Sequence, residues 1–211
     1  MGARGGRRGF ALGAAALAAA LAASALAADR PAKAKPAETP ALLEQGSTVY
    51  FRRCSFCHGL IGDGDGPAAE FLDPRPRDFT LGTYKFRTTQ SGKLPTDEDL
   101  FRTVSRGLPG TAMQAFDNDV IKNGLSEEDR WAVIAYIKTF AQEFKNSEFD
   151  PYKQLVSLPK NMPAMSDATI AKGKQVFEKA KCWECHGKQG RGDGQKAFDR
   201  ADDWGFPIRI R

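Results

Sequence analysis

Two short clusters hold every cysteine and histidine of this 211-residue chain, Cys54–His58 and Cys182–His186. Each reads C-x-x-C-H, the attachment pattern of a c-type haem. Two thiols three positions apart on one helical turn can form thioethers with the vinyl groups of one porphyrin, and the adjoining imidazole can then ligate the iron. We therefore expect two covalently attached haem c groups, with His58 and His186 as axial ligands. The porphyrins would be anchored by the thiols of Cys54, Cys57, Cys182 and Cys185.

Three other uses of these cysteines stay open on the motif alone. They are a pair of structural disulfides, a zinc ion bound by four thiolates, and a thioredoxin-like redox pair. The first two leave both histidines without a role. The third needs a βαβ context, whereas the flanking sequence lacks the alternation of a strand. Haem attachment accounts for the cysteines and the histidines together.

The overall charge argues against binding to nucleic acid. The chain has 31 basic and 26 acidic residues, a net charge of +5, and part of this excess comes from Arg4, Arg7 and Arg8. Without these three the body is close to neutral and offers no broad phosphate-binding face. With 27% charged and 41% hydrophobic residues, the composition suits a soluble globular protein.

The first residues have the form of an export signal. The three arginines precede an apolar run over 10–28, which contains the cleavage pattern Ala25-Leu26-Ala27. We expect a cleaved signal peptide over 1–28 and a periplasmic protein. An uncleaved membrane anchor is the alternative. A flexible segment rich in Pro and Ala over 29–40 should follow.

Residues 41–145 resemble a class I cytochrome c domain. Gly46 and Tyr50 precede the first cluster as in the amino-terminal helix of that family, and Val133–Lys138 resembles its carboxy-terminal helix. Ser126 would cap the second helix. The resemblance implies that Gly46 and Tyr50 cross Val133 and Tyr136, because glycine permits close approach of another helix.

The resemblance also assigns roles around the iron. Met113, in the run Leu108–Met113, has the setting of the family's sulfur ligand, and no histidine is left over for that position. Pro67, at the end of a glycine-rich acidic loop, is the candidate whose carbonyl accepts the N–H of the proximal imidazole. Arg77 and Arg87 are candidate partners of the haem propionates. The acidic loop does not have the spacing of a calcium-binding EF-hand.

A second, incomplete unit follows over 166–211, after a linker over 146–165. The segment 173–177 mirrors 46–50, and 190–194 mirrors 62–66. No Met, His or Cys comes after His186, and no second carboxy-terminal helix is present to cover the haem. Three explanations stay open: a fragment of a longer gene product, closure by the first domain, a partner or another copy, or ligation by Met162 or Met165.

The expected fold is therefore all-α, a class I cytochrome c domain followed by a partial cytochrome c-like unit. The expected function is periplasmic relay of single electrons between a respiratory donor and a terminal reductase or oxidase, without enzymatic turnover. The partners would be redox proteins, with no organic substrate and no nucleic acid. Association with a membrane would come only through a partner or an uncleaved amino terminus. The rival functions are a di-haem peroxidase and a permanent haem-bearing subunit of a larger complex.

Overall fold

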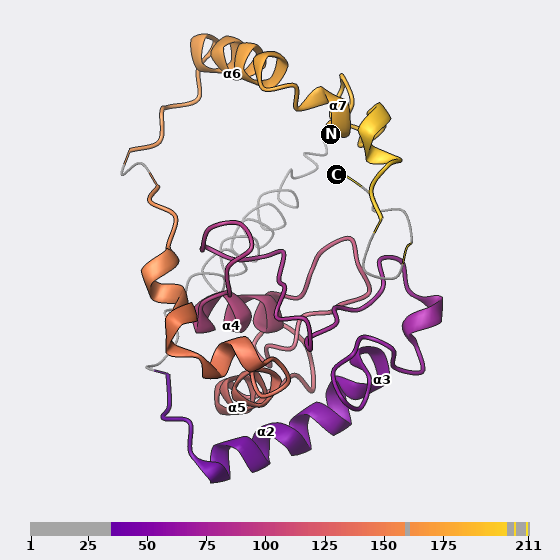
Figure 1. Ribbon diagram of the computed structural model, residues 1–211, viewed down its shortest axis with the longest axis vertical. Coiled ribbons are helices and arrows are strands. Elements are labelled where there is room, and N and C mark those ends of the chain that lie inside the picture. Colours follow the sequence, from indigo (N-terminus) through magenta and orange to yellow (C-terminus); the bar gives the residue numbers. More distant parts are fainter. Residues whose placement is uncertain (1–34, 159–160, 202–204, 206–209, 211) are drawn as a thin grey trace, which may run out of the picture. The chain divides into compact units, whose positions relative to one another are not determined.

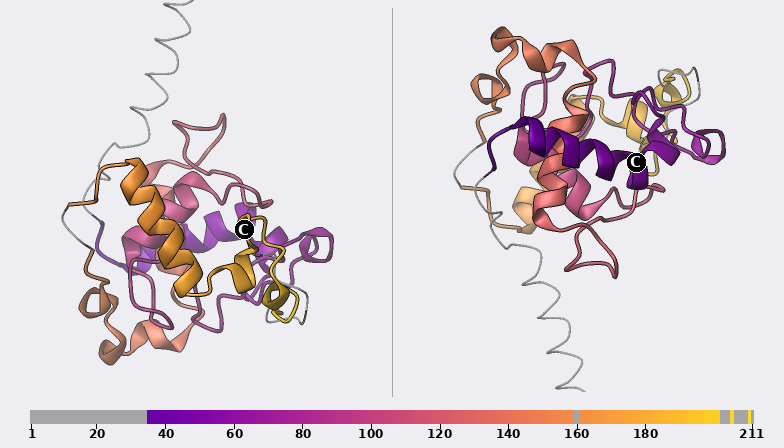
Figure 2. Two further views of the ribbon diagram at one scale, coloured as in Figure 1. Left: turned by 90° about the horizontal axis from the view of Figure 1, so that it is seen from above. Right: turned by 90° about the horizontal axis from the view of Figure 1, so that it is seen from below.

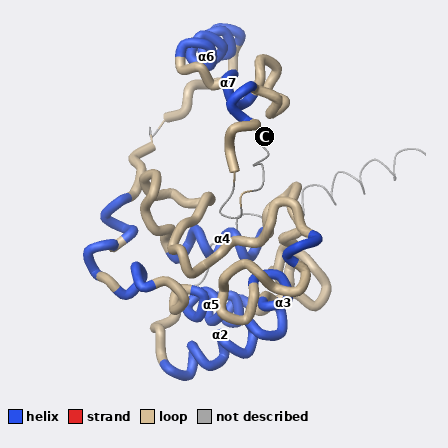
Figure 3. Tube along the Cα trace, turned by 45° about the vertical axis from the view of Figure 1, so that its right-hand side comes forward, coloured by secondary structure: helices blue, strands red, loops and turns tan. Residues whose placement is uncertain are grey.

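A computed structural model describes residues 35–158, 161–201, 205 and 210. The predicted signal peptide lies outside the described residues. The described chain is helical and contains no strand, only isolated bridges such as Thr89 to Leu155 (Figure 3). This confirms the all-α prediction. None of the described helices has both the length and the hydrophobicity that crossing a bilayer requires.

The chain divides into two compact units. The first contains the described residues up to Phe71 and Pro76–Leu155, and the second contains Leu72–Arg75 and the described residues from Val156 onward. The helices of the first unit are α2 (Pro40–Arg53), α3 (Ser55–His58), α4 (Asp97–Arg106) and α5 (Glu127–Ile137) (Figure 1). Those of the second are α6 (Asp167–Lys179) and α7 (Trp183–His186). Short 3₁₀ turns lie at Ala69–Phe71, Gln142–Lys145, Ser147–Phe149, Pro151–Gln154 and Gln195–Ala197.

The crossing of α2 and α5 organises the first unit, as the view from below in Figure 2 shows. Gly46 lies directly against the carbonyl of Ala132 and the Cβ of Tyr136, where a side chain at position 46 would clash. The rings of Tyr50 and Tyr136 lie 5.5 Å apart. The predicted crossing is therefore present, with Ala132 rather than Val133 against the glycine.

Local capping explains where the helices of the first unit begin. The side chain of Thr96 accepts a hydrogen bond from Asp99 N, and the Asp99 carboxylate accepts one from Thr96 N, so α4 starts with a capping box. Ser126 caps α5 in the predicted way, through Asp129 N at 3.0 Å. Gly107 ends α4 with a φ of 66°, a conformation that favours glycine.

The core of the first unit forms between α2, α4, α5 and the segment that follows the first cluster. Tyr50 and Val133 are completely buried, and Trp131 stacks on Phe101 with ring centroids 4.2 Å apart. The other buried residues of this core are Phe79, Tyr84, Leu100, Val104, Ile134 and Ile137. The first haem motif, Cys54–His58, therefore directly follows α2, a helix that packs into this core.

The first unit extends into the region where we expected a linker. Gln90 N donates to Gln154 O at 2.9 Å, and the Tyr152 hydroxyl donates to Glu98 Oε2 at 2.9 Å. Because these bonds fix the 3₁₀ turn at Pro151–Gln154 to the first unit, the chain leaves that unit only after Leu155.

The second unit has a capped helix with no covering partner among the described residues. Ser166 caps α6 through Thr169 N at 3.2 Å. None of the residues of α6 is buried, and a Cβ at Gly173 would meet nothing within 4 Å. The contrast with Gly46 shows that this unit repeats the first helix of the fold, with no helix packed on it in the part of the unit that the structure describes.

Candidate haem sites

The first cluster lies where α2 gives way to the single turn of α3. Cys57 N and His58 N both donate to Cys54 O, at 3.1 and 2.9 Å, so the two cysteines and the histidine share one helical turn. The Tyr50 hydroxyl donates to Gly59 O at 2.7 Å and lies 3.3 Å from His58 O. This turn is the geometry that attachment of one porphyrin through two thioethers requires.

The imidazole of His58 is held from one side by the chain that returns after the acidic loop. Its Nδ1 lies 3.0 Å from the carbonyl oxygen of Arg77, and its ring stacks on Phe79 with centroids 4.5 Å apart. A carbonyl at Nδ1 fixes the tautomer that leaves Nε2 available for iron. Burial lowers the pKa of His58, which also favours the neutral imidazole that a metal requires.

Pro67, the residue predicted to bond to the imidazole, and Arg77 lie on different segments of the chain. Pro67 is exposed, and the chain turns into the 3₁₀ turn at Ala69–Phe71 directly after it. The segment around Arg77 reaches the histidine because Phe79 N bonds to Gly62 O at 2.6 Å and Gly64 packs against Pro76 O. In this structure the carbonyl at the imidazole comes from this returning segment, and the role of Pro67 stays a prediction.

The loop that carries Met113 is a compact turn. Leu108 N donates to Met113 O at 2.9 Å, and the Thr111 hydroxyl donates to Leu108 O at 2.8 Å. The half-buried Met113 packs at the edge of the same core cluster as Cys54. The structure thus brings both residues to one core, and the axial role of Met113 stays a prediction.

Two buried polar atoms test whether the residues present fit a haem. The hydroxyl of Tyr84 and the indole N–H of Trp131 are buried and have no hydrogen-bond partner among the described residues, and both residues belong to the core cluster. Buried donors normally have acceptors. The carboxylates of a haem would bring such acceptors to an apolar core, so the residues fit the group. The sequence placed Tyr84 in a segment expected to cover a haem edge and Trp131 on an apolar helix face, but it did not indicate that their polar atoms are buried.

The two predicted arginine partners of the propionates stay predictions. Arg87 donates from Nε to Gln90 O at 3.1 Å and from Nη1 to Tyr84 O, so its guanidinium also holds its own loop. Arg77 contributes its carbonyl to His58. Arg77 therefore contacts the histidine through its backbone rather than through its guanidinium.

The second cluster repeats the geometry of the first. His186 N donates to Cys182 O at 2.9 Å, and Gly192 N donates to His186 O at 2.8 Å. A Cβ at Gly194 would lie 2.6 Å from Trp183 O, as one at Gly66 would lie 2.6 Å from Ser55 O. The predicted internal repeat is thus present in three dimensions from the motif through its glycine loop.

The methionines of the second unit that are candidate ligands point into solvent. Met162 is 87% exposed and Met165 is 90% exposed. In this structure neither packs over the second cluster. Four free thiols are described at Cys54, Cys57, Cys182 and Cys185, and the described residues contain no group of three or more potential metal-binding side chains.

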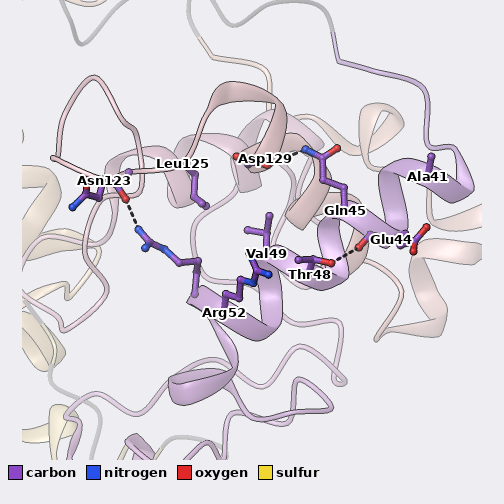
Figure 4. Close-up of a pocket in the computed structure, with 11 residues that line it drawn as sticks. Ala41, Glu44, Gln45, Thr48, Val49, Arg52, Asn123, Leu125 and Asp129 are labelled. Atoms are coloured by element: carbon purple, nitrogen blue, oxygen red, sulfur yellow. Dashed lines mark hydrogen bonds between the residues drawn. The ribbon is translucent and has the colours of Figure 1, made fainter.

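A surface pocket of about 670 Å³ lies elsewhere on the first unit, between α2 and the segment before α5 (Figure 4). Gln45 Nε2 donates to Asp129 Oδ1 at 2.9 Å beside it, and Arg53 Nη2 donates to Asn123 O at 2.6 Å. Its lining contains neither a cysteine nor a histidine, so this pocket is not a haem site.

The helical fold and the repeated motif define a c-type cytochrome, and comparison with known proteins agrees. The profile of the Cytochrome c family matches residues 43–141 and 170–207, and the chain belongs to this family. The two matched regions, each with its C-x-x-C-H cluster, give a protein with two covalently bound haem c groups.

Its relatives include components of redox complexes. The chain is 26% identical over 161 residues to the Cbb3-type cytochrome c oxidase subunit CcoP of Helicobacter pylori, covering 76% of this chain and 43% of that protein. The match to the subunit of a second strain is of the same extent, so the chain spans less than half of these curated relatives. A chain of the Kuenenia stuttgartiensis reducing HAO-like protein complex Kustc0457/Kustc0458 is 44% identical, with a TM-score of 0.69. This match covers 79% of our chain and 72% of that one.

Proposed function

We propose that this haem electron-transfer cytochrome works in the periplasm as a di-haem relay within a larger redox complex. It would pass single electrons from a respiratory donor towards a terminal reductase or oxidase. The observation that carries the proposal is the pair of haem motifs in a chain whose relatives are a subunit of an oxidase and a chain of a multi-protein complex.

The chemistry of the site supports a relay rather than turnover of a substrate. A neutral His58 held at Nδ1 would bind the haem iron through its other ring nitrogen, and the thioether of Met113 would be the second ligand from the protein. Such a ligand pair raises the reduction potential and leaves no open position on iron for a substrate. What haem supplies when bound is reversible one-electron chemistry, while the protein sets its potential and orientation.

Isolation of the native protein under mild conditions tests the proposed assembly. Membrane and soluble fractions would be separated on native gels, stained for covalent haem and analysed by mass spectrometry. We expect the chain to migrate with a second redox protein, at a size well above its own 23.0 kDa. Migration as a free monomer in every fraction would support a diffusing carrier and overturn the complex.

The second candidate function is a di-haem peroxidase. It is favoured by one observation: among the described residues, no side chain lies where it could be the sixth ligand of the second haem iron. The oxidation of a reduced dye by hydrogen peroxide distinguishes the two functions. A relay should show no saturable turnover above that of free haem peptide. Saturable turnover by the two-haem protein would replace the relay with the peroxidase.

A further inference from the structure

The segment that carries Met113 is a loop with a closed base. Phe116 N donates to Val104 O at 3.1 Å, and Asp117 N donates to Ser105 O at 3.3 Å. These two bonds join the end of α4 to the chain that leaves the loop. The loop between them therefore has its two ends side by side, as in an Ω-loop.

Arg130 of α5 connects the two sides of this base. Its Nη1 donates to Ser105 Oγ at 2.5 Å and to Asp117 Oδ2 at 2.6 Å. The side chain is only 6% exposed, and its guanidinium carbon lies 4.8 Å from the centre of the Phe101 ring. The guanidinium of Arg130 on α5 thus bonds to both chain segments of the loop base.

Beyond this base, Met113 packs at the edge of the core cluster of the first unit. Met113 N bonds to Thr111 Oγ1 at 3.1 Å, and Leu108 N bonds to Met113 O, so these bonds lie within the loop itself. A methionine side chain is flexible and adaptable, so its position depends on the backbone that carries it. The local opening of such a loop requires less free energy than the unfolding of the core.

We propose that Arg130 is the positioning residue that keeps the base of the Met113 loop closed and so keeps the thioether on the first haem iron. The inference rests on the proposed axial role of Met113. The planar guanidinium suits this place because Nη1 donates to the hydroxyl and the carboxylate, Nε donates to Ser126 O at 3.4 Å, and the group stacks on the Phe101 ring. Removal of one partner of a buried ion pair also leaves the other charge unpaired.

The test uses the two-haem, full-length protein and its ferric sulfur-to-iron charge-transfer absorption, which reports only a methionine-ligated haem. Excess imidazole displaces the methionine, and the rate at which the absorption disappears measures how often the loop opens. We expect this rate to rise about tenfold or more in Arg130→Met, where the partly buried Asp117 carboxylate loses its cationic partner. Arg130→Lys should give an intermediate rate, because the charge remains without the fork.

Two further variants distinguish positioning from a general loss of stability. Asp117→Asn removes the same ion pair with little change of shape, so it should accelerate the displacement as Arg130→Met does, and it carries the test if Arg130→Met does not fold. Lys138→Met removes two ion pairs at the other end of α5, where Lys138 Nζ lies 2.6 Å from Glu38 Oε1 and 2.8 Å from Asp97 Oδ1. It should lower the free energy of unfolding without changing the displacement rate.

Rates within about twofold of the wild type in both Arg130→Met and Asp117→Asn would overturn the inference, because partners in one network should couple by more than that. Equal acceleration by Lys138→Met would overturn it as well. Absence of the absorption from the wild-type protein would instead refute the axial role of Met113, and the inference with it. That outcome would leave the two covalent haems and the relay function unaffected.

Discussion

The hydroxyl of Tyr50 donates a 2.7 Å hydrogen bond to the carbonyl of Gly59, the residue directly after the first haem motif. Tyr50 is completely buried between α2 and α5, so the bond ties the motif to the helix crossing. In the second unit the corresponding residue is Phe177, which has no hydroxyl. The two motifs therefore share a local geometry but differ in how the core holds them.

Replacing Tyr50 by Phe should lower the free energy of unfolding of the first unit by about 1 kcal/mol, because the ring stays and the buried hydrogen bond is lost. Denaturant unfolding of the two-haem protein, followed by circular dichroism, measures the change. Tyr152→Phe is the matched control, since its hydroxyl bonds to Glu98 at an exposed site. Equal losses in the two variants would contradict the structural role of Tyr50.

Gly46 and Gly173 should respond in opposite ways to replacement by Ala. A methyl group at Gly46 would clash with the carbonyl of Ala132, and overpacking of this kind costs roughly 1–3 kcal/mol or more. A methyl group at Gly173 meets no neighbour, and Ala in a helix interior is better than Gly by about 0.5–1 kcal/mol. Unfolding midpoints of the two variants measure the difference. A destabilised Gly173→Ala would show that a further helix covers α6 in the native protein.

The stability of the first unit should fall in acid because of a group of four charges. Lys138 Nζ lies 2.6 Å from Glu38 Oε1, Lys35 Nζ lies 2.9 Å from the same oxygen, and both lysines pair with Asp97. Burial alone would raise the pKa of Glu38 and Asp97. The hydrogen bonds from the lysines outweigh it and hold both pKa values below the ordinary 4.5 and 3.8.

Because these folded-state pKa values are depressed, the stabilisation is complete above the ordinary values and is lost as the pH falls through the folded ones. Unfolding free energies measured from pH 6 down to pH 3, about the range in which carboxyls titrate, should therefore decline below about pH 4.5. Lys138→Met should flatten this decline, since one cation of the group is gone. An unchanged slope in that variant would contradict the assignment.

Met113→Ala should abolish the ferric sulfur-to-iron absorption while the covalent haem remains. The reduction potential of that haem should fall, because a thioether favours the ferrous state. Met165→Ala, at a position 90% exposed, is the control and should change neither quantity. Persistence of the absorption in Met113→Ala would assign the sulfur ligand to another residue.

The sequence predicted those parts of the fold that local patterns determine. Ser126 and Ser166 cap helices as expected, and Gly46 is at a helix crossing, because capping and close approach depend on residue types at fixed spacing. The repeated glycine loops after His58 and His186 could be predicted for the same reason, since their backbone turns depend on glycine at fixed positions.

Features that depend on the path of a loop could not be predicted in this way. The acceptor for the His58 imidazole is the Arg77 carbonyl because the chain returns past the acidic loop, and no local pattern distinguishes that carbonyl from that of Pro67. The burial of the Tyr84 hydroxyl and the Trp131 indole N–H, without an acceptor among the described residues, depends on how the core packs, which no local pattern predicts. The attachment of Gln154 to Gln90 likewise joins segments far apart in the sequence, so no local pattern indicates that this part of the expected linker contacts the first unit.

The mass of the intact protein, produced in a host that matures c-type cytochromes, tests the central claim most directly. We predict that the polypeptide carries two haems that acidified organic solvent does not extract, and that replacing Cys54 and Cys57 by Ala removes one of them. Replacing Cys182 and Cys185 by Ala should remove the other. A protein with the mass of the polypeptide alone, or one that releases its haem into the solvent, would contradict the account.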